Sequence, residues 1–379
     1  MNLVCIINGL ATGGAETMLL KLLQNLDHRH FAPQVISLTT QGDLGPRIEN
    51  LGIPVHALGM LPGRPNFIKF IRLVKLLRRL QPDAVHTWMY HADLLGGLAT
   101  RLAGIKTVAW TIRNSDLSAE HSKRSTRIAM KACARASTSL PRFIVTCSKR
   151  ANAIHVAAGY CADKWVQLPN GFDLSHFQPD AGARYAVRME LGLAPDTPLV
   201  GLIARNDPQK NHSGFIEAAA LVQNALPQVH FALVGNGIDG NNHALTALIN
   251  RAGLTKHFHL LGRRDDMAPL MASFDLLASA SSYGEAFPNV LGEAMACGVL
   301  CVATDVGDSA EIIGDTGRVV APGDMAGLAQ HLIELLQWPA DQRRRLGALA
   351  RQRIHNHYEI GAVTRHYERF YNQLRQGTV

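Results

Sequence analysis

Short apolar runs alternate with amphipathic stretches along the whole chain. The apolar runs are rich in Val, Ile and Leu, a pattern typical of strands that are buried on both faces. In the stretches between them apolar residues recur every three or four positions, which predicts helices that cover a sheet. The strands predicted in this way are Leu3–Asn8, Ala32–Ser37, Ala84–Trp88, Thr107–Thr111, Phe143–Cys147, Leu199–Ala204, His230–Gly235, His257–Leu261, Leu276–Ser279 and Leu300–Ala303.

This alternation occurs in two series, one before and one after a crossover near residues 168–198. Strands separated by helices predict parallel sheets with helices on both faces. We therefore expect an α/β fold of two doubly wound, Rossmann-like domains, residues 1–170 and 171–356. Ligands of such domains lie beyond the carboxyl ends of the strands, so the cleft between the two domains is the expected active site.

Composition narrows the class of protein. The 379 residues include six cysteines without metal-ligand spacing, which fits a reducing compartment. The first residues match a buried strand rather than a signal peptide. No apolar run approaches the ~20 residues that a transmembrane helix needs. We therefore expect a cytoplasmic protein.

Positive charge is concentrated in the first half of the chain. Residues 1–170 contain 21 Lys and Arg against 9 Asp and Glu, whereas the remainder contains 17 against 21. The stretch 121–162 has no acidic residue, and the predicted helix 67–80 carries a cationic stripe of Lys69, Arg72, Lys75 and Arg79. Two interpretations stay open, a solvated edge of a core helix or contact with an anionic membrane surface. No nucleic-acid recognition motif accompanies the charge, so we expect no nucleic-acid partner.

The segment Tyr283–Gly298 carries the strongest chemical signal. Glu285 lies on a Gly/Pro-rich loop after a predicted strand, and Glu293 lies about two turns into the predicted helix Asn289–Cys297. This spacing allows both carboxylates to point the same way, and free N–H groups at a helix start attract anions. The arrangement suits a ligand with both hydroxyls and phosphate, such as a sugar nucleotide. The alternative is a pair of solvated surface charges.

Two basic residues follow another predicted strand, Leu199–Ala204. Arg205 as a fork and Lys210 as a point charge are suited to grip a diphosphate and to stabilise the charge of a departing nucleotide. No Asp-x-Asp motif is present, so we expect no metal in this role. After the first strand, Gly13 and Gly14 allow a phosphate to approach a helix start closely. The alternatives are a solvated basic pair and an ordinary turn.

The region Asp275–Glu311 resembles the signature of the retaining, family 4 glycosyltransferases, also described as glycosyl transferases group 1. It contains an apolar strand, an E-x7-E pair, and the segments A-M-A-C-G and A-T-D-V-G followed by a Glu. The resemblance extends over nearly the whole chain through the Gly13-Gly14-Ala15-Glu16 loop, the Pro169–Asp173 crossover and the Arg205…Lys210-Asn211 pair. It implies the GT-B fold, in which a C-terminal helix, here within 357–379, crosses back onto the first domain.

The resemblance also implies roles by position. Glu285 is expected to contact the hydroxyls of the transferred sugar, and Glu293 those of the ribose. Backbone amides at the helix start are expected to approach the sugar or phosphate. The expected donor-binding residues there are Ala286, Phe287, Asn289 and Val290. Ala286 stands where the family usually has Gly. His91 matches an acceptor-facing His of the family and joins the catalytic set, whereas the acceptor-side candidates are His86, Arg113 and Asn114.

We therefore expect a retaining, metal-independent hexosyltransferase that uses a nucleoside-diphosphate-sugar, UDP rather than GDP, and no cofactor. The expected acceptor is a hydroxyl of a lipid-linked glycan in surface polysaccharide biosynthesis, at the cytoplasmic face of the membrane. Three alternatives stay open: transfer to a small soluble acceptor, 2-epimerisation of a sugar nucleotide, and a non-catalytic sugar-nucleotide-binding protein. Four charged residues argue against a non-catalytic protein, because without a ligand they would be costly to keep: Arg205, Lys210, Glu285 and Glu293.

Overall fold

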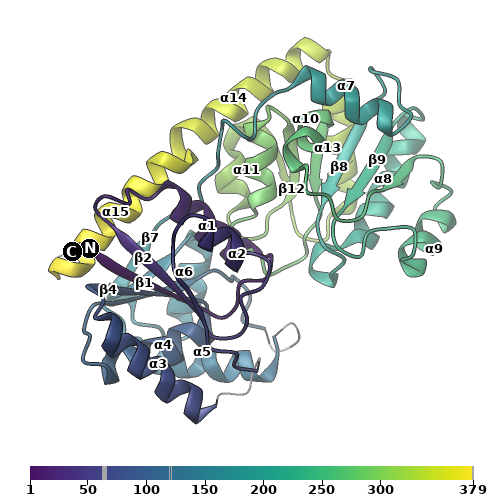
Figure 1. Ribbon diagram of the computed structural model, residues 1–379. Helices are drawn as coiled ribbons and strands as arrows, with labels where there is room; N and C mark the ends of the chain where they lie inside the picture. The colour runs from purple at the N-terminus through teal and green to yellow at the C-terminus, as the bar shows by residue number, and fades with distance from the viewer. Residues whose placement is uncertain (62–65, 119, 121, 378–379) are drawn as a thin grey trace. The chain divides into compact units, whose positions relative to one another are not determined.

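The computed structural model describes residues 1–61, 66–118, 120 and 122–377. Position 121 of the predicted basic stretch 121–162 lies outside the described residues. So do positions 378–379 of the predicted C-terminal segment 357–379. The chain divides into two compact units (Figure 1). Unit 1 consists of Met1–Gly171 together with the segment that begins at Ile360, and unit 2 is Phe172–Glu359.

Unit 1 is built on a parallel sheet that has seven strands among the described residues, in the order β3-β2-β1-β4-β5-β6-β7. The strands are β1 (Asn2–Ile7), β2 (Ala32–Ser37), β3 (Val55–Ala57), β4 (Ala84–Trp88), β5 (Val108–Ile112), β6 (Phe143–Thr146) and β7 (Trp165–Gln167). The helices are α1 (Gly14–Asn25), α2 (Gly45–Glu49), α3 (Phe67–Leu80), α4 (Tyr90–Leu102), α5 (Arg124–Ala136), α6 (Lys149–Ala157) and α15 (Ile360–Gln376), with a 3₁₀ turn at Ala162–Lys164.

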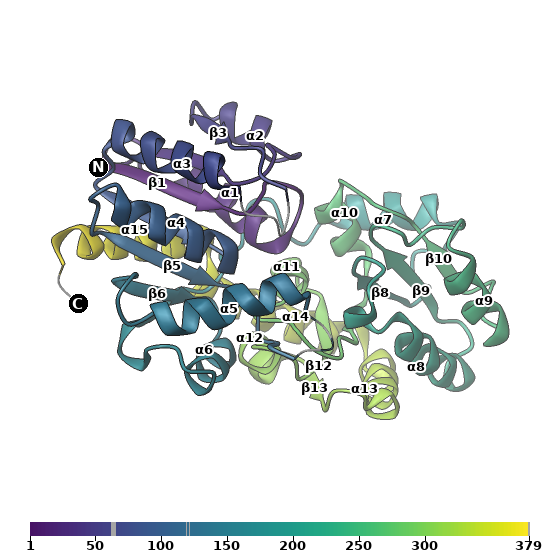
Figure 2. The same cartoon turned by 90° about the horizontal axis from the view of Figure 1, so that it is seen from below.

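The central strands of unit 1 are buried on both faces because their apolar residues alternate between two cores. Cys5 and Ile7 pack in one core with residues of α1 and α15, whereas Val4 and Ile6 pack in the other with residues of α3, α4 and α5. Figure 2 shows α15 behind the strands and α3, α4 and α5 on the side nearer the viewer. The C-terminal helix therefore lies with α1 in the helical layer that covers one face of this sheet.

Unit 2 is built on a second parallel sheet, which has six strands among the described residues in the order β10-β9-β8-β11-β12-β13. The strands are β8 (Leu199–Ile203), β9 (His230–Val234), β10 (Phe258–Leu260), β11 (Leu276–Ser279), β12 (Leu300–Thr304) and β13 (Arg318–Val320). The helices are α7 (Ala181–Glu190), α8 (His212–Ala225), α9 (His243–Arg251), α10 (Met267–Ser273), α11 (Asn289–Ala296), α12 (Ser309–Ile313), α13 (Met325–Gln337) and α14 (Ala340–Tyr358), with 3₁₀ turns at Pro208–Lys210 and Gly314–Thr316.

In both sheets the strand order reverses at one point. The reversal lies between β1 and β4 in unit 1 and between β8 and β11 in unit 2, because each of these pairs is parallel and adjacent. The loops that leave such a pair of strands run to opposite sides and leave room for a ligand beyond the carboxyl ends. The residues after β1, β4, β8 and β11 are therefore the first place to look for a site.

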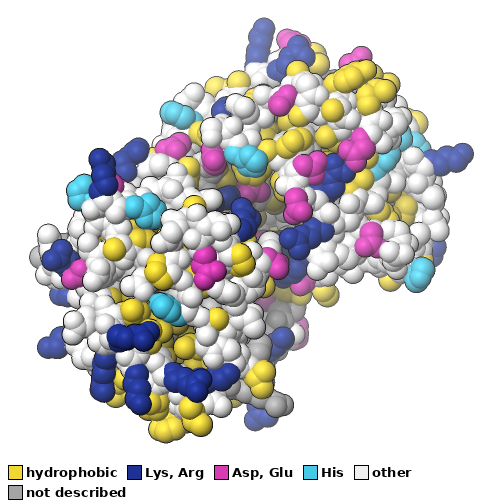
Figure 3. Space-filling model, viewed as in Figure 1, with side chains coloured by type: hydrophobic (Ala, Val, Ile, Leu, Met, Phe, Trp, Pro, Cys, Tyr) yellow, Lys and Arg dark blue, Asp and Glu magenta, His cyan; other side chains and the backbone are white. Residues whose placement is uncertain are grey.

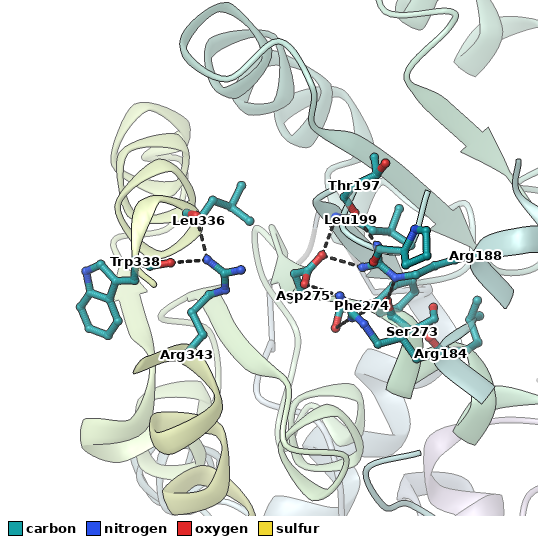
Figure 4. A network of polar contacts seen from close by, with 12 residues as sticks. Arg184, Arg188, Thr197, Leu199, Ser273, Phe274, Asp275, Leu336, Trp338 and Arg343 are labelled. Carbon is teal, nitrogen blue, oxygen red and sulfur yellow. Dashed lines mark hydrogen bonds and ion pairs between the residues drawn. The ribbon is translucent and has the colours of Figure 1, made fainter. Parts of the chain in front are cut away.

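A buried ion-pair network holds the opposite, amino ends of β8 and β11 (Figure 4). Asp275 accepts from the guanidinium of Arg188 at 2.6 Å, from that of Arg184 at 2.7 Å and from the backbone N–H of Leu199 at 2.8 Å. The Arg188 side chain is only 1% exposed. Because Leu199 starts β8 and Asp275 precedes β11, the network fixes the two strands whose other ends carry the candidate site.

Two further findings bear on the expected class of protein. All six cysteines lie within the described part of the chain and are free thiols. Among the described residues, no helix has both the length and the apolar character that crossing a membrane requires.

Candidate active site

The predicted charged residues of unit 2 meet at its strand-order reversal. The chain leaves β8 into the segment that carries Arg205 and Lys210, and it leaves β11 into the loop that carries Glu285. Lys210 and Glu285 form an ion pair through Nζ and Oε1, and their side chains are 18% and 13% exposed. The Ser281 hydroxyl donates to the same Oε1 at 3.0 Å. The residue expected to bind the diphosphate, Lys210, and the residue expected to bind the sugar, Glu285, are thus in direct contact.

Backbone contacts fix the two loops against each other and against the loop after β12. The N–H of Ser282 donates to the carbonyl of Gln209 at 2.8 Å, and the N–H of Asp308 donates to that of Ala286 at 3.0 Å. Gly307 has a positive φ of 63°, and a Cβ there would lie 2.2 Å from the carbonyl oxygen of Glu285. Only glycine fits this position, so the backbone around Glu285 is held closely in place.

Arg205 does not join the Lys210–Glu285 pair. Its side chain is 59% exposed, and its guanidinium donates to Asp207 at 3.0 Å and to Gln209 at 3.3 Å. The carboxylate of Asp207 also caps the 3₁₀ turn that carries Lys210, through the N–H of Gln209. Asp207 therefore links the two basic residues, and Arg205 keeps an exposed charge at the rim of the site.

The start of α11 presents backbone rather than side chains. Ala286 and Phe287 are buried, and Phe287 stacks against Phe172 and packs edge-on against Tyr358. Helix α11 begins at Asn289 after Pro288 and has no side-chain cap. Its first N–H groups are consequently oriented for an anion. Val290 and Glu293 are half-buried on this helix.

At the corresponding position of unit 1, Gly13 caps α1 and Gly14 is its first residue. Gly13 has an extended backbone with φ of −158°, so its conformation alone does not require glycine. A Cβ at Gly13 would lie 2.4 Å from Oε2 of Glu16. The glycine therefore makes room for a carboxylate that folds back over the start of its own helix. Burial raises the pKa of Glu16, although the nearby charge of Arg113 opposes this shift.

Arg113, a predicted acceptor-side residue, is held from three directions. Its guanidinium lies 4.4 Å from the ring centroid of Trp88, donates to the side-chain oxygen of Asn170, and donates to the hydroxyl of Tyr367 at 2.9 Å. Asn114 closes a local turn with Asp116, through an N–H bond to its Oδ1 at 3.1 Å. Arg113 thus offers a positioned charge, whereas Asn114 shapes the loop.

The two predicted histidines of unit 1 have different environments. His86 is fully buried, and its ring nitrogens contact the hydroxyls of Thr111 and Tyr371. Burial lowers the pKa of His86 to about 3, so it is a neutral core residue. This buried position does not support its assignment to the acceptor side, because a fully buried ring cannot contact an acceptor. The strand pattern alone did not show which face of the sheet the side chain takes. His91 is half-buried at the start of α4 and lines a cavity of unit 1, and burial lowers its pKa.

Sequence reasoning missed several residues that shape these positions. Ser281, Gln209 and Asp207 lie in the same two loops as Glu285 and Lys210, and Asn170 belongs to the Pro169-Asn170-Gly171 crossover. These residues could have been found from the sequence, because they directly follow predicted strands or belong to a motif already noted. The contacts of Gln209 with Ser282 and of Asn170 with Arg113 join residues far apart in the chain, so spacing alone could not reveal them.

Comparison with known proteins gives two matching family models. The model described as glycosyl transferases group 1 matches residues 197–338, and the model described as glycosyltransferase family 4 matches residues 12–176. Each model falls mainly in one of the two units.

Two curated relatives share somewhat more than a quarter of the aligned residues with this chain. The UDP-Gal:α-D-GlcNAc-diphosphoundecaprenol α-1,3-galactosyltransferase of Escherichia coli is 28% identical over 247 residues, which are 62% of this chain and 61% of that protein. The chain therefore spans less than two thirds of the length of this relative. EpsF of Bacillus subtilis (strain 168) is 27% identical over 310 residues, 79% of this chain and 78% of that protein.

Among solved structures, Anabaena HepE in complex with UDP and glucose superposes with a TM-score of 0.85 at 22% identity, over 98% of this chain and 100% of that chain. This likeness shows the fold, which is GT-B with a parallel-sheet Rossmann-like domain in each unit. Since the two family models together match more than half of the sequence, the chain belongs to the family 4, group 1 glycosyltransferases.

Proposed function

We propose that this protein is a retaining glycosyltransferase that moves a hexose-type sugar from a UDP-sugar to a hydroxyl of a lipid-linked glycan in surface polysaccharide assembly. The observation that carries the proposal is the Lys210–Glu285 pair at the strand-order reversal of unit 2. A cation for the diphosphate and an anion for sugar hydroxyls are adjacent where doubly wound folds bind ligands. The complex of HepE with UDP favours uridine as the base of the donor.

Each side chain has a role in this reaction. Lys210 and Arg205 stabilise the negative charge that develops on the departing UDP, with help from the first N–H groups of α11. Glu285 accepts hydrogen bonds from sugar hydroxyls, and Glu293 accepts them from the ribose. Because two cations and a helix start serve the diphosphate, we propose that transfer needs no divalent metal.

Retention follows if the acceptor attacks on the face that UDP leaves. The bond between the anomeric carbon and the β-phosphate oxygen breaks, a bond to the acceptor oxygen forms on the same face, and the acceptor proton passes to the departing phosphate. No side-chain nucleophile is needed. Catalysis then consists of positioning and electrostatic stabilisation.

Unit 1 is the proposed acceptor side, with His91 orienting the acceptor and Arg113 lining its site. The lipid-linked acceptor is supported by the diphosphoundecaprenol substrate in the name of the Escherichia coli relative. It is also supported by the charge of unit 1. Figure 3 shows Lys and Arg side chains interspersed with hydrophobic ones over the part of unit 1 formed by α3 and α4. We propose that this basic surface rests on an anionic cytoplasmic leaflet.

The test is UDP release from a panel of UDP-, GDP- and ADP-sugars in EDTA, with and without a polyprenyl-diphosphate-linked sugar. We expect one UDP-sugar to react, with at least tenfold stimulation by the lipid-linked acceptor. The anomeric proton coupling of the product should match that of the donor. Stimulation by a free sugar alone would replace the lipid-linked acceptor with a soluble one. Conversion of donor without any transfer product would indicate an epimerase and overturn the proposal.

A further inference from the structure

A cavity of about 530 Å³ lies within unit 1, outside the donor-binding residues of unit 2. It opens beyond the carboxyl ends of the first strands, since Asn8 follows β1, Thr39 follows β2 and His91 follows β4. Its size is within the range of roughly 300–1,000 Å³ that small-molecule sites occupy. The transfer chemistry of unit 2 does not account for it.

The walls of this cavity are mainly apolar. Leu38, Met60 and Ala129 are buried in its wall, and Leu94 and Leu95 of α4 are half-buried there. The two polar groups at its sheet edge are already engaged: Oδ1 of Asn8 accepts from the N–H of Ala92 at 2.8 Å, and the Thr39 hydroxyl donates to the carbonyl of Asn8 at 2.9 Å. The other polar side chains of the lining are His91 on α4 and, at the start of α5, Lys123, Ser125 and Thr126. The remaining seven lining residues are apolar and favour a hydrocarbon.

The apolar lining continues to the protein surface. Leu61 and Ile128 line the cavity and are nevertheless 65% and 60% exposed. These two residues therefore line the cavity and also reach solvent, which suits the entry of an apolar chain.

Positive charge lies at the same opening. Lys123 lines the cavity, Arg124 begins α5, and both side chains are exposed. Lys123 occupies the cap position of α5 without a side-chain cap, so the first N–H groups of this helix add to the positive potential. An apolar cavity with a cationic rim is complementary to an amphiphile whose hydrocarbon chain ends in a phosphate or diphosphate.

We propose that this cavity binds the first isoprenoid units of the polyprenyl chain of a lipid-linked acceptor, with the diphosphate at Lys123 and the start of α5. The inference rests on the proposed function and specifies its acceptor site. His91 lines the same cavity, and its Nε2 makes no hydrogen bond within the described part of the chain. A chain held here brings the head of the acceptor to the histidine proposed to orient it.

The test is the affinity of the whole protein for dimethylallyl, geranyl and farnesyl diphosphate, measured by calorimetry below the concentrations at which micelles form. Each buried methylene strengthens binding on the order of fourfold, so even a partly buried isoprene unit adds at least about tenfold. Ile128→Asn and Leu61→Asn should remove most of this gain and leave dimethylallyl diphosphate binding within about twofold, because the amide is polar but adds no charge near the diphosphate. Lys123→Ala should weaken all three ligands by a similar factor.

Leu98→Asn and Leu102→Asn are matched controls, because both leucines are exposed on α4 but do not line the cavity. They should leave the dependence on chain length unchanged. An affinity that does not rise from dimethylallyl to farnesyl diphosphate would overturn the proposal. So would an equal effect of the control variants. If Ile128→Asn weakens only binding to anionic phospholipid vesicles, the residues contact the bilayer and the cavity holds no chain.

Neither outcome depends on turnover, because no sugar nucleotide is present in these titrations. Failure of the proposed function would instead appear as absence of transfer and of stabilisation by UDP-sugars. The two proposals can thus fail separately.

Discussion

Lys210 and Glu285, 75 positions apart in the chain, form an ion pair that joins the end of β8 to the loop after β11. Both side chains are mostly buried, so in the absence of ligand each supplies the charge that the other needs. A bound UDP-sugar offers new partners to both, a diphosphate to Lys210 and hydroxyls to Glu285. The pair therefore holds the site in shape before the donor arrives.

The first prediction concerns this pair. Glu285→Gln keeps the shape of the side chain but removes the charge that holds sugar hydroxyls and Lys210. We expect the transfer rate to fall by about 100-fold or more, the usual scale for loss of a strong electrostatic contact in the transition state. Lys210→Ala should lower both UDP-sugar affinity and turnover. Initial rates and the thermal shift produced by UDP measure these effects.

Arg263→Ala is the matched control for both variants, because Arg263 is an exposed basic residue of unit 2 that pairs only loosely with Asp265, at 3.8 Å. It should retain the wild-type rate. Glu285→Gln and Lys210→Ala proteins that are folded and equally active would remove these residues from the site.

A second prediction addresses metal independence. If Arg205, Lys210 and the start of α11 carry the charge of the departing UDP, prolonged treatment with EDTA should change the transfer rate by less than about twofold. Added Mg²⁺ or Mn²⁺ should not rescue Lys210→Ala. A rate that collapses in EDTA and returns with one divalent ion would show that a metal shares the role of the two basic residues.

Much of this fold could be predicted from the sequence, because most strands of four or more residues are mainly apolar. Ala32–Ser37, Ala84–Trp88 and Leu276–Ser279 have the predicted bounds. The missed strands β3, β7 and β13 are three residues long and lie at sheet edges, where most of their residues are only half-buried. Three residues are too few for an apolar period to appear, and β10, equally short, was predicted only as part of the longer run His257–Leu261.

The candidate site was predictable as a set of residue types but not as a set of contacts. The positions of Lys210 and Glu285 after strands indicated a shared sheet edge, yet nothing in the spacing indicated that they pair with each other. His86 illustrates the converse. A polar residue in the strand Ala84–Trp88 suggested function, whereas α15, almost 300 positions away, supplies the Tyr371 hydroxyl that makes it a core residue.

A third prediction concerns the network beneath β8 and β11. Asp275→Asn leaves the buried guanidinium of Arg188 without its charged partner, which should lower the free energy of unfolding by about 3–5 kcal/mol. Urea denaturation measures the loss. Asp265→Asn is the control, because its side chain is 93% exposed, and it should change stability by less than about 0.5 kcal/mol. A loss no larger than that of the control would mean that the network does not stabilise unit 2.

A fourth prediction concerns the basic surface of unit 1. Arg72, Lys75 and Arg79 are exposed on α3, whereas Lys69 is half-buried and donates to the carbonyl of Gly59. Each exposed cation near an anionic leaflet contributes about 1 kcal/mol, so replacing the three with Gln should weaken vesicle binding on the order of 100-fold at low salt. The difference should shrink as salt is added.

The control for the vesicle experiment replaces Arg251, Lys256 and Arg345 of unit 2, which are also exposed. Both triple variants lose the same charge, so a purely non-specific attraction would fall equally in the two. Equal losses would return α3 to the interpretation of a core helix with a solvated edge.

The last prediction concerns Asp93 of α4, whose carboxyl is buried and accepts from the Thr87 hydroxyl at 2.5 Å and the Thr111 N–H at 3.3 Å. Burial raises the pKa of Asp93 from 3.8 to about 7 and outweighs both hydrogen bonds, which lower it. The unfolded chain therefore loses this proton near pH 4, while the folded protein keeps it until about pH 7. The contribution of Asp93 to the free energy of unfolding is fully present below pH 4 and is lost as the pH rises to about 7.

Asp93→Asn should remove this loss, because the amide is neutral at every pH and its oxygen still accepts from Thr111. The variant should gain stability relative to wild type between pH 4 and pH 7, by an amount on the order of 4 kcal/mol at pH 8. The difference between the two proteins is the useful measure. His86, whose pKa is lowered to about 3, makes folding more favourable with rising pH in both. Urea denaturation at several pH values tests this, with the exposed Asp163→Asn as control. Parallel profiles for wild type and Asp93→Asn would show that the carboxyl ionises without cost in the folded protein.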